Sequence, residues 1–125
     1  MKDKMIVLIV EDSPIVTERL MNMINDLDHV KFTLQAFNYN EAITLYKAVK
    51  PNVIVLDINL PDKNGIEVLK TIRELGGTER VIVLTNYAND FYKKECIECG
   101  ADYFLDKSKD FEKISKLIVI DDKAA

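Results

Sequence analysis

The sequence IVLIVEDSP, residues 6–14, passes from five apolar residues straight into two carboxylates, a serine and a proline. The apolar run is rich in β-branched residues and predicts a buried strand. Ser13 and Pro14 predict the N-cap and the first residue of a helix, because serine accepts a hydrogen bond from an early N–H and proline has none to lose. Glu11 and Asp12 therefore stand where a strand ends, and the first question is what they do there.

Further short apolar runs alternate with helical patterns along the chain. The predicted strands are residues 5–10, 31–36, 53–56, 81–84 and 103–105. One helix follows Ser13, and others are predicted at 39–49, 65–75, 89–99 and from near Asp110 onward. In each helix the apolar residues recur at the spacing of one buried stripe. In the last helix these residues are Phe111, Ile114, Leu117 and Ile118.

The alternation of strands with helices of crossover length predicts a parallel sheet covered on both faces. The runs at 5–10, 53–56 and 81–84 are continuously apolar, as central strands are, whereas 31–36 alternates with polar residues like an edge strand. We therefore expect an α/β fold: a doubly wound, five-stranded parallel sheet of order 2-1-3-4-5, the flavodoxin-like (βα)5 sandwich. In this order the connections reverse direction between the first and third strands.

Composition limits the class of protein. The chain has 125 residues, 48% of them hydrophobic and 30% charged, with a formal net charge of -4. These values predict one globular domain over residues 1–125 without the basic field needed for direct nucleic-acid binding. No apolar run approaches the roughly 20 residues of a membrane span. The N-terminal MKDKMIVLIV leads into acids without a cleavage site, so we expect no signal peptide, no membrane contact and a cytoplasmic location.

Cys96 and Cys99 have the spacing of a metal or redox motif. A zinc site needs about four ligands, and the one histidine of the chain, His29, is far away in the sequence. A redox pair is expected at a helix N-terminus, whereas these cysteines end a predicted helix, just before Gly100. We interpret them as two reduced packing residues.

In a doubly wound sheet, ligands bind outside the carboxyl ends of the strands, at the switch point. The residues at the ends of the four contiguous strands are Glu11 with Asp12, Asp57, Thr85 and Lys107. Three carboxylates so close together would repel one another and raise the pKa of at least one, unless a cation is bound. An acidic, all-oxygen site with few protein ligands suits Mg²⁺, which gives Glu11 and Asp12 a purpose.

The remaining groups suit phosphoryl chemistry. Asp57, at the end of the central strand, is placed to attack phosphorus as a carboxylate nucleophile. Lys107 and Thr85 can meet the negative charge of a transferred phosphoryl group. Any one of these residues alone is commonly just solvated, and an acid pair before a helix can simply favour its dipole. Their joint occurrence on one rim carries the prediction.

Four stretches, IVEDSP, VIVLDINLPDKNGIEVLKTIR, VIVLTN and GADYFLDKSKDF, resemble the receiver (CheY-like) domain of two-component response regulators. The resemblance covers the whole chain. It implies that Asp57 is the phospho-acceptor and that Asp12 binds the metal directly. It also implies that Glu11 holds the metal mostly through water, and Asn59 through its backbone carbonyl. Gly65 matches the loop that follows the acceptor.

The same resemblance implies a conformational switch. Thr85 is then the switch hydroxyl, and Lys107 pairs with the phosphoryl oxygens. Phe104, three residues before that lysine, matches the switch aromatic. A one-residue change in strand register would give this role to Tyr103.

Three positions depart from the family pattern. Asn86 follows Thr85 where a small residue is usual, which predicts a more crowded phosphoryl pocket. Ser108 follows Lys107 where many receivers have proline, which puts the family's cis peptide at that bond in question. Phe104 lacks a ring hydroxyl, so its movement must depend on burial.

The expected protein is a phosphorylation-controlled switch and not an enzyme. It takes a phosphoryl group from a histidine kinase or a histidine phosphotransfer protein and remodels the face of the fourth helix, fifth strand and fifth helix. Its output is a downstream protein or a C-terminal effector domain. The sequence leaves open whether the chain is a single-domain regulator or a piece of a longer chain. It also leaves open whether the protein forms a dimer on phosphorylation.

Two other functions remain as alternatives. A Mg²⁺-dependent phosphatase of the haloacid dehalogenase type also uses an aspartyl nucleophile, but it carries a second aspartate where Asn59 stands. A receiver-shaped interaction module that is never phosphorylated typically lacks Asp12, Asp57 or Lys107, and this chain has all three.

Overall fold

Five strands form one parallel sheet in the order β2-β1-β3-β4-β5, as predicted. The computed structural model describes residues 4–119, so residues 1–3 and 120–125 of the predicted domain lie outside it. The strands are β1 (Met5–Val10), β2 (Val30–Ala36), β3 (Val53–Leu56), β4 (Arg80–Thr85) and β5 (Tyr103–Asp106). The helices are α1 (Pro14–Asn25), α2 (Tyr39–Val49), α3 (Gly65–Glu74), α4 (Asp90–Glu98), the 3₁₀ helix η1 (Phe111–Lys113) and α5 (Ile114–Leu117).

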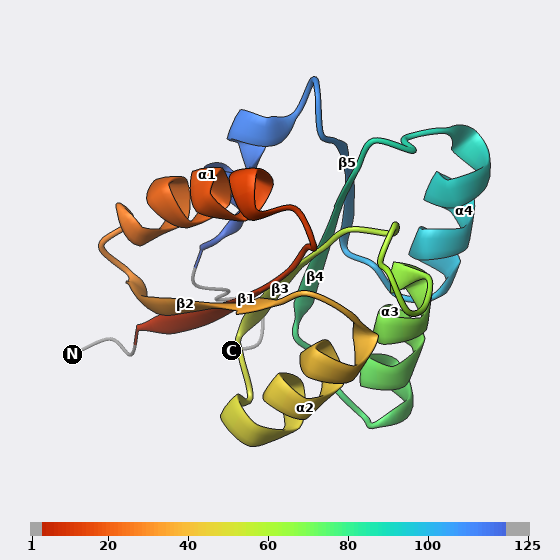
Figure 1. Ribbon diagram of the computed structural model, residues 1–125, viewed down its shortest axis with the longest axis horizontal. Coiled ribbons are helices and arrows are strands. Elements are labelled where there is room, and N and C mark those ends of the chain that lie inside the picture. The colour runs from red at the N-terminus through yellow and green to blue at the C-terminus, as the bar shows by residue number, and fades with distance from the viewer. Residues whose placement is uncertain (1–3, 120–125) are drawn as a thin grey trace.

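The helices cover both faces of the sheet (Figure 1). Alternate residues of β1 point to opposite sides: Leu8 and Val10 pack with α2, α3 and α4, whereas Val7 and Ile9 pack with α1, η1 and α5. Because both sides of the central strands are covered, β1 and β3 read as continuous apolar runs. The interpretation of β2 as an edge strand is confirmed, and its Phe32 is 38% exposed.

The helix starts follow the predicted capping chemistry. The hydroxyl of Ser13 accepts a hydrogen bond from the N–H of Val16, and Pro14 is the first residue of α1. The side chains of Asn38, Asn64 and Asn89 cap α2, α3 and α4 in the same way. These caps fix where the loops at the carboxyl edge of the sheet become helix.

The fifth helix is shorter than the sequence pattern predicts, so that part of the prediction is wrong. Residues 111–113 form a 3₁₀ turn, and 114–117 form a single α-helical turn. At Ile118 the backbone has φ -91° and ψ 81°, outside the helical region. Ile118 and Val119 are β-branched, which lowers helix propensity. The buried stripe itself is largely as predicted, since Phe111, Ile114 and Ile118 are buried.

The cysteines are free in the structure, in accord with their interpretation as packing residues. Cys96 is the buried residue of α4, and burial, with the nearby Cys99 and Glu95, raises the pKa of its thiol to about 11. Cys99 is half-buried and packs against the same core. Within residues 4–119, no helix has the length and apolar character needed to cross a membrane.

Candidate phosphoryl-accepting site

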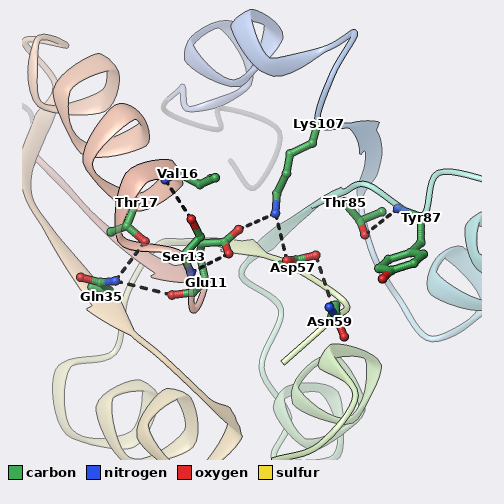
Figure 2. A network of polar contacts seen from close by, with 10 residues as sticks. All are labelled: Glu11, Ser13, Val16, Thr17, Gln35, Asp57, Asn59, Thr85, Tyr87 and Lys107. Carbon is green, nitrogen blue, oxygen red and sulfur yellow. Dashed lines mark hydrogen bonds and ion pairs between the residues drawn. The ribbon is translucent and has the colours of Figure 1, made fainter. Parts of the chain in front are cut away.

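Lys107 joins two acids that follow different strands. Glu11 comes directly after β1, Asp57 after β3 and Lys107 after β5. The lysine Nζ lies 2.7 Å from Oε1 of Glu11 and 3.0 Å from Oδ2 of Asp57. The Glu11 and Asp57 side chains are buried, and the Lys107 side chain is only 10% exposed. Figure 2 shows the ammonium between the two carboxylates.

The sheet itself positions these residues, because its backbone hydrogen bonds continue just past the strand ends. The N–H of Asp57 donates to the carbonyl of Val10 at 3.0 Å, and the N–H of Lys107 donates to the carbonyl of Thr85 at 3.0 Å. The N–H of Glu11 donates to Ala36 on β2, also at 3.0 Å. The functional side chains therefore extend from backbone that is still held like a strand.

Burial and charge act in opposite directions on the site. Burial raises the pKa of Glu11, although its bonds to Lys107 and to the N–H of Ser13 oppose the rise. Burial alone would lower the pKa of Lys107, but hydrogen bonds to Glu11 and Asp57 outweigh it and the pKa is raised. Lys107 therefore carries its proton, and one ammonium offsets two buried acids.

Asp12 completes an acidic cluster around this pair. Its side chain is exposed, and ligand oxygens of Glu11, Asp12 and Asp57 all lie within 4.8 Å of one another. Three carboxylates against a single ammonium leave excess negative charge, and oxygen donors are the ligands that Mg²⁺ prefers. The residues present therefore fit this metal. Asn59 is exposed in the adjoining loop, where its N–H donates to Oδ1 of Asp57 at 3.4 Å.

Thr85 stands on the same rim but is not hydrogen-bonded to Asp57 among the described residues. It is fully buried as the last residue of β4, and its hydroxyl accepts a hydrogen bond from the N–H of Tyr87 at 3.1 Å. No hydrogen bond joins Thr85 to Asp57 within the described residues, as Figure 2 illustrates. The rim thus brings the acids and the lysine together and leaves the hydroxyl engaged elsewhere.

The two candidate switch rings lie on opposite faces of the sheet. Phe104 is half-buried and packs with the core under α2, α3 and α4, whereas Tyr103 packs on the α1 side. Phe104 pairs with Val83 in the β4–β5 register, so it lies on the strand next to Thr85. The face shared with α4 favours Phe104 over Tyr103 as the ring that could respond to Thr85.

The departures from the family pattern have structural correlates. No cis peptide bond occurs within residues 4–119, so the bond between Lys107 and Ser108 is trans. Ser108 instead closes a turn, its N–H and hydroxyl both donating to Oδ1 of Asp106 at 2.8 and 2.7 Å. Asn86 is exposed between Thr85 and Tyr87.

Backbone groups make contacts that the side-chain pattern did not reveal. The N–H of Ser13 donates to Oε2 of Glu11, and the N–H of Tyr87 holds the Thr85 hydroxyl. Gly65 starts α3 against the backbone of Asp57: a Cβ at this position would lie 2.0 Å from the Asp57 carbonyl oxygen. A glycine at the first position of a helix was the signal for this close approach.

These features define a class of α/β protein in which acidic oxygens that could hold a divalent cation, together with an ammonium group, surround a carboxylate at the switch point of the sheet. The family model described as the response regulator receiver domain matches residues 7–119. The chain therefore belongs to the response regulator receiver domain family.

Three relatives illustrate the match. The chemotaxis protein CheY of Halobacterium salinarum is 30% identical over 93% of both chains. A protein-glutamate methylesterase/protein-glutamine glutaminase of Clostridium acetobutylicum is 31% identical over 92% of this chain and 34% of its own length. The crystal structure of the response regulator domain of Thermotoga maritima CheB superposes with a TM-score of 0.81 at 29% identity, covering 92% of this chain and 90% of that one.

The extent of these matches has two consequences. The chain spans between a third and about half of the length of the first curated relatives that it matches. The receiver family model also covers every residue at the carboxyl ends of the strands, from Glu11 to Lys107, so the phosphatase alternative is not favoured.

Proposed function

We propose that Asp57 accepts a phosphoryl group from a phosphohistidine of a sensor kinase or a histidine phosphotransfer protein, with Mg²⁺ bound beside it. The observation that carries this proposal is the buried contact between Lys107 and Asp57, 3.0 Å long, inside a cluster of acids. A buried ammonium on a carboxylate that also faces other acids is suited to the charge of a transferred phosphoryl group.

The chemistry balances as a simple displacement. A carboxylate oxygen of Asp57 forms a bond to phosphorus while the donor's P–N bond breaks, and the electron pair of that bond returns to the imidazole nitrogen. Mg²⁺, held by Asp12 and Asp57 with Glu11 through water and the Asn59 carbonyl, would neutralise charge on the phosphoryl oxygens. Lys107 already lies at the acceptor and pairs with another phosphoryl oxygen.

The switch that follows uses Thr85 and Phe104. A phosphoryl group on Asp57 offers the Thr85 hydroxyl a charged acceptor, which competes with its present bond to the Tyr87 N–H. As Thr85 moves, space opens between β4 and β5 for Phe104. Complete burial of a phenylalanine is worth about 1.5–3 kcal/mol, so we expect Phe104 to be mixed between two positions before phosphorylation.

Intact-mass measurement tests the acceptor. With acetyl phosphate and Mg²⁺, the chain should gain one phosphoryl group, and the gain should vanish in Asp57→Asn or when the metal is chelated. Asp62→Asn is the matched control, because Asp62 is an exposed acid in the same loop and should leave labelling intact. Full labelling of Asp57→Asn would contradict the assignment.

A pair of structures tests the switch. With beryllofluoride bound as a phosphoryl mimic, we expect Thr85 to leave the Tyr87 N–H, Phe104 to turn inward, and the face of α4, β5 and α5 to change. If Thr85 and the rings of Tyr103 and Phe104 stay where they are, the proposed transmission is wrong.

The wider role is part of the same proposal. We infer one receiver domain over residues 1–125, located in the cytoplasm, that acts as a phospho-acceptor and not as an enzyme. Its partners are then the phosphodonor protein and either a downstream protein or a C-terminal effector domain. Dimerisation on phosphorylation is a further expectation, which light scattering with and without beryllofluoride would test.

A further inference from the structure

A partly buried polar bridge behind the acidic cluster connects β2 to α1. The side-chain nitrogen of Gln35 donates to the Thr17 hydroxyl at 3.0 Å and lies 3.5 Å from the carbonyl oxygen of Glu11 (Figure 2). Thr17 is 2% exposed and Glu11 is 3% exposed. Because a carbonyl can only accept, the amide nitrogen of Gln35, and not its oxygen, must face Glu11.

This carbonyl lies where the sheet can no longer supply a donor. β2 ends at Ala36, whose carbonyl still accepts the N–H of Glu11. No backbone N–H donates to the Glu11 carbonyl within residues 4–119. The Gln35 side chain therefore takes the place of the missing backbone donor, and Thr17 holds that side chain in position.

The peptide group fixed in this way joins Glu11 to Asp12. Its orientation sets the direction in which both carboxylates leave the backbone. Glu11 has further anchors in Lys107 and the Ser13 N–H, whereas the Asp12 carboxylate has no hydrogen-bond partner in the described part of the chain. Asp12 is thus the acid that depends most on its backbone for position.

We propose that Gln35, held by Thr17, is a positioning residue for the metal site: it fixes the Glu11–Asp12 peptide so that both acids face the acceptor. The inference deepens the proposed function and rests on its Mg²⁺ site. Groups that orient metal ligands from behind commonly change metal affinity by 10- to 100-fold when they are removed. The bond to the carbonyl is long, so we expect about the lower end of that range.

Magnesium titration by NMR of the unphosphorylated protein tests this, with the amide signals of Asp12 and Asn59 as the readout. Gln35→Met keeps the shape of the side chain and removes the donor, and it should weaken Mg²⁺ binding about tenfold. Thr17→Val should weaken Mg²⁺ binding less than Gln35→Met does. Thr17→Ser keeps the hydroxyl and should bind Mg²⁺ with the wild-type affinity. Wild-type Mg²⁺ affinity in Gln35→Met would overturn the proposal.

Thr33→Val is the matched control. The Thr33 hydroxyl donates to Oδ1 of Asn25 at 3.3 Å, so it also connects β2 to α1, but away from the acids. Urea unfolding should show similar small losses of stability for Thr33→Val and Gln35→Met, with Mg²⁺ affinity lost only in the second. If both variants lose Mg²⁺ affinity equally, the bridge acts only through general packing and the proposed positioning role is refuted.

The metal-free protein separates this inference from the proposed function. If the wild-type chain binds no Mg²⁺, the metal part of the proposed function fails. The backbone amide signal of Asp12 then decides: a shift in metal-free Gln35→Met but not in Thr33→Val supports the positioning role. An unshifted signal in Gln35→Met contradicts it.

Discussion

Two cationic side chains organise opposite edges of the sheet, and they bond to different kinds of partner. At the carboxyl edge, Lys107 contacts the carboxylates of Glu11 and Asp57. At the amino edge, the Arg73 guanidinium donates to the backbone carbonyls of Gly77, Glu79 and Gly100 at 2.7–3.1 Å, and to Asp102 at 3.3 Å. One cation is held by charges and the other mainly by neutral backbone.

This difference in bonding partners means that the Lys107 site can exchange ligands, whereas the Arg73 site cannot. A carboxylate can bind a metal ion as well as an ammonium group. A metal ion at Glu11 and Asp57, or a phosphoryl group that accepts hydrogen bonds from the ammonium, can therefore change the contacts of Lys107. The carbonyls around Arg73 belong to the chain connections before β4 and β5, and they need a donor in every functional state. We therefore expect the lysine to act in signalling and the arginine to fix the end of α4.

The largest effect is expected from Lys107→Met. Removing the ammonium leaves buried Glu11 and Asp57 facing each other uncompensated, and loss of one partner from a buried ion pair costs about 3–5 kcal/mol. Mg²⁺ should restore much of this stability, since it supplies the missing positive charge. Urea unfolding with and without Mg²⁺ measures both effects.

Lys113→Met is the control for that experiment. Lys113 also pairs with an acid, Asp110, at 3.0 Å, but the lysine side chain is 64% exposed. We expect little change in stability and no added response to Mg²⁺. If Lys107→Met behaves like this control, the view of the carboxyl edge as a charge-held site is wrong.

Arg73→Met should destabilise the protein by about 2 kcal/mol, because several carbonyls lose a charged donor at once. In contrast to Lys107→Met, Mg²⁺ should restore none of this loss, and phosphorylation by acetyl phosphate should continue. Arg73→Lys should recover only part of the stability, since an ammonium cannot reproduce the planar fork of donors. Recovery of Arg73→Met by Mg²⁺ would remove the distinction between the two edges.

Asn86→Ala addresses the phosphoryl group after it has been transferred. Asn86 follows Thr85 at the rim, where its side chain should narrow the path of water to the aspartyl phosphate. We expect faster dephosphorylation in the variant with unchanged Mg²⁺ affinity, measured by phosphate release. An unchanged phosphoryl lifetime would show that crowding at this position has no kinetic effect.

The smallest effect is expected from Asp62, an acid of the carboxyl edge that bonds to backbone. Desolvation alone would raise the pKa of Asp62, but the combined hydrogen bonds from backbone N–H groups, among them those of Tyr39, Asn40 and Lys63, outweigh it and lower the pKa. A lowered pKa stabilises the fold above the ordinary pKa of aspartate, and this contribution is lost as pH falls through the folded-state value. The stability difference between wild type and Asp62→Ala should therefore shrink from pH 6 to pH 3. A difference independent of pH would contradict a role for these backbone bonds in holding the carboxylate ionised.

The sheet order and the rim acids could be predicted because they depend on position along the chain alone. Continuous apolar runs identify central strands, and parallel strands bring their carboxyl ends to one edge, so Glu11, Asp57 and Lys107 meet in any structure of this topology. The length of α5 could not be predicted from its apolar stripe, since Ile118 stays buried after the helix has ended.

The contacts of Gln35 and Arg73 could not be predicted for a different reason. Each depends on a side-chain conformation that reaches across several elements, and both residues have ordinary surface-type side chains in the sequence. In the sequence, Gln35 is one of the polar residues that alternate along an edge strand, and Arg73 is a basic residue in the last turn of a helix. Only packing shows which backbone carbonyls each one meets.

Gly65 has a consequence for how this chain can vary over evolutionary time. The space that a Cβ would need is filled by the backbone of Asp57 and Ile58, so even alanine must push Asp57 out of place. A saturation library selected for signalling should therefore lose every substitution at position 65, as we also expect at Asp57, the proposed acceptor, although the glycine contributes no atom to the chemistry. We therefore expect the two positions to be conserved together, Asp57 for its reactivity and Gly65 for having no side chain.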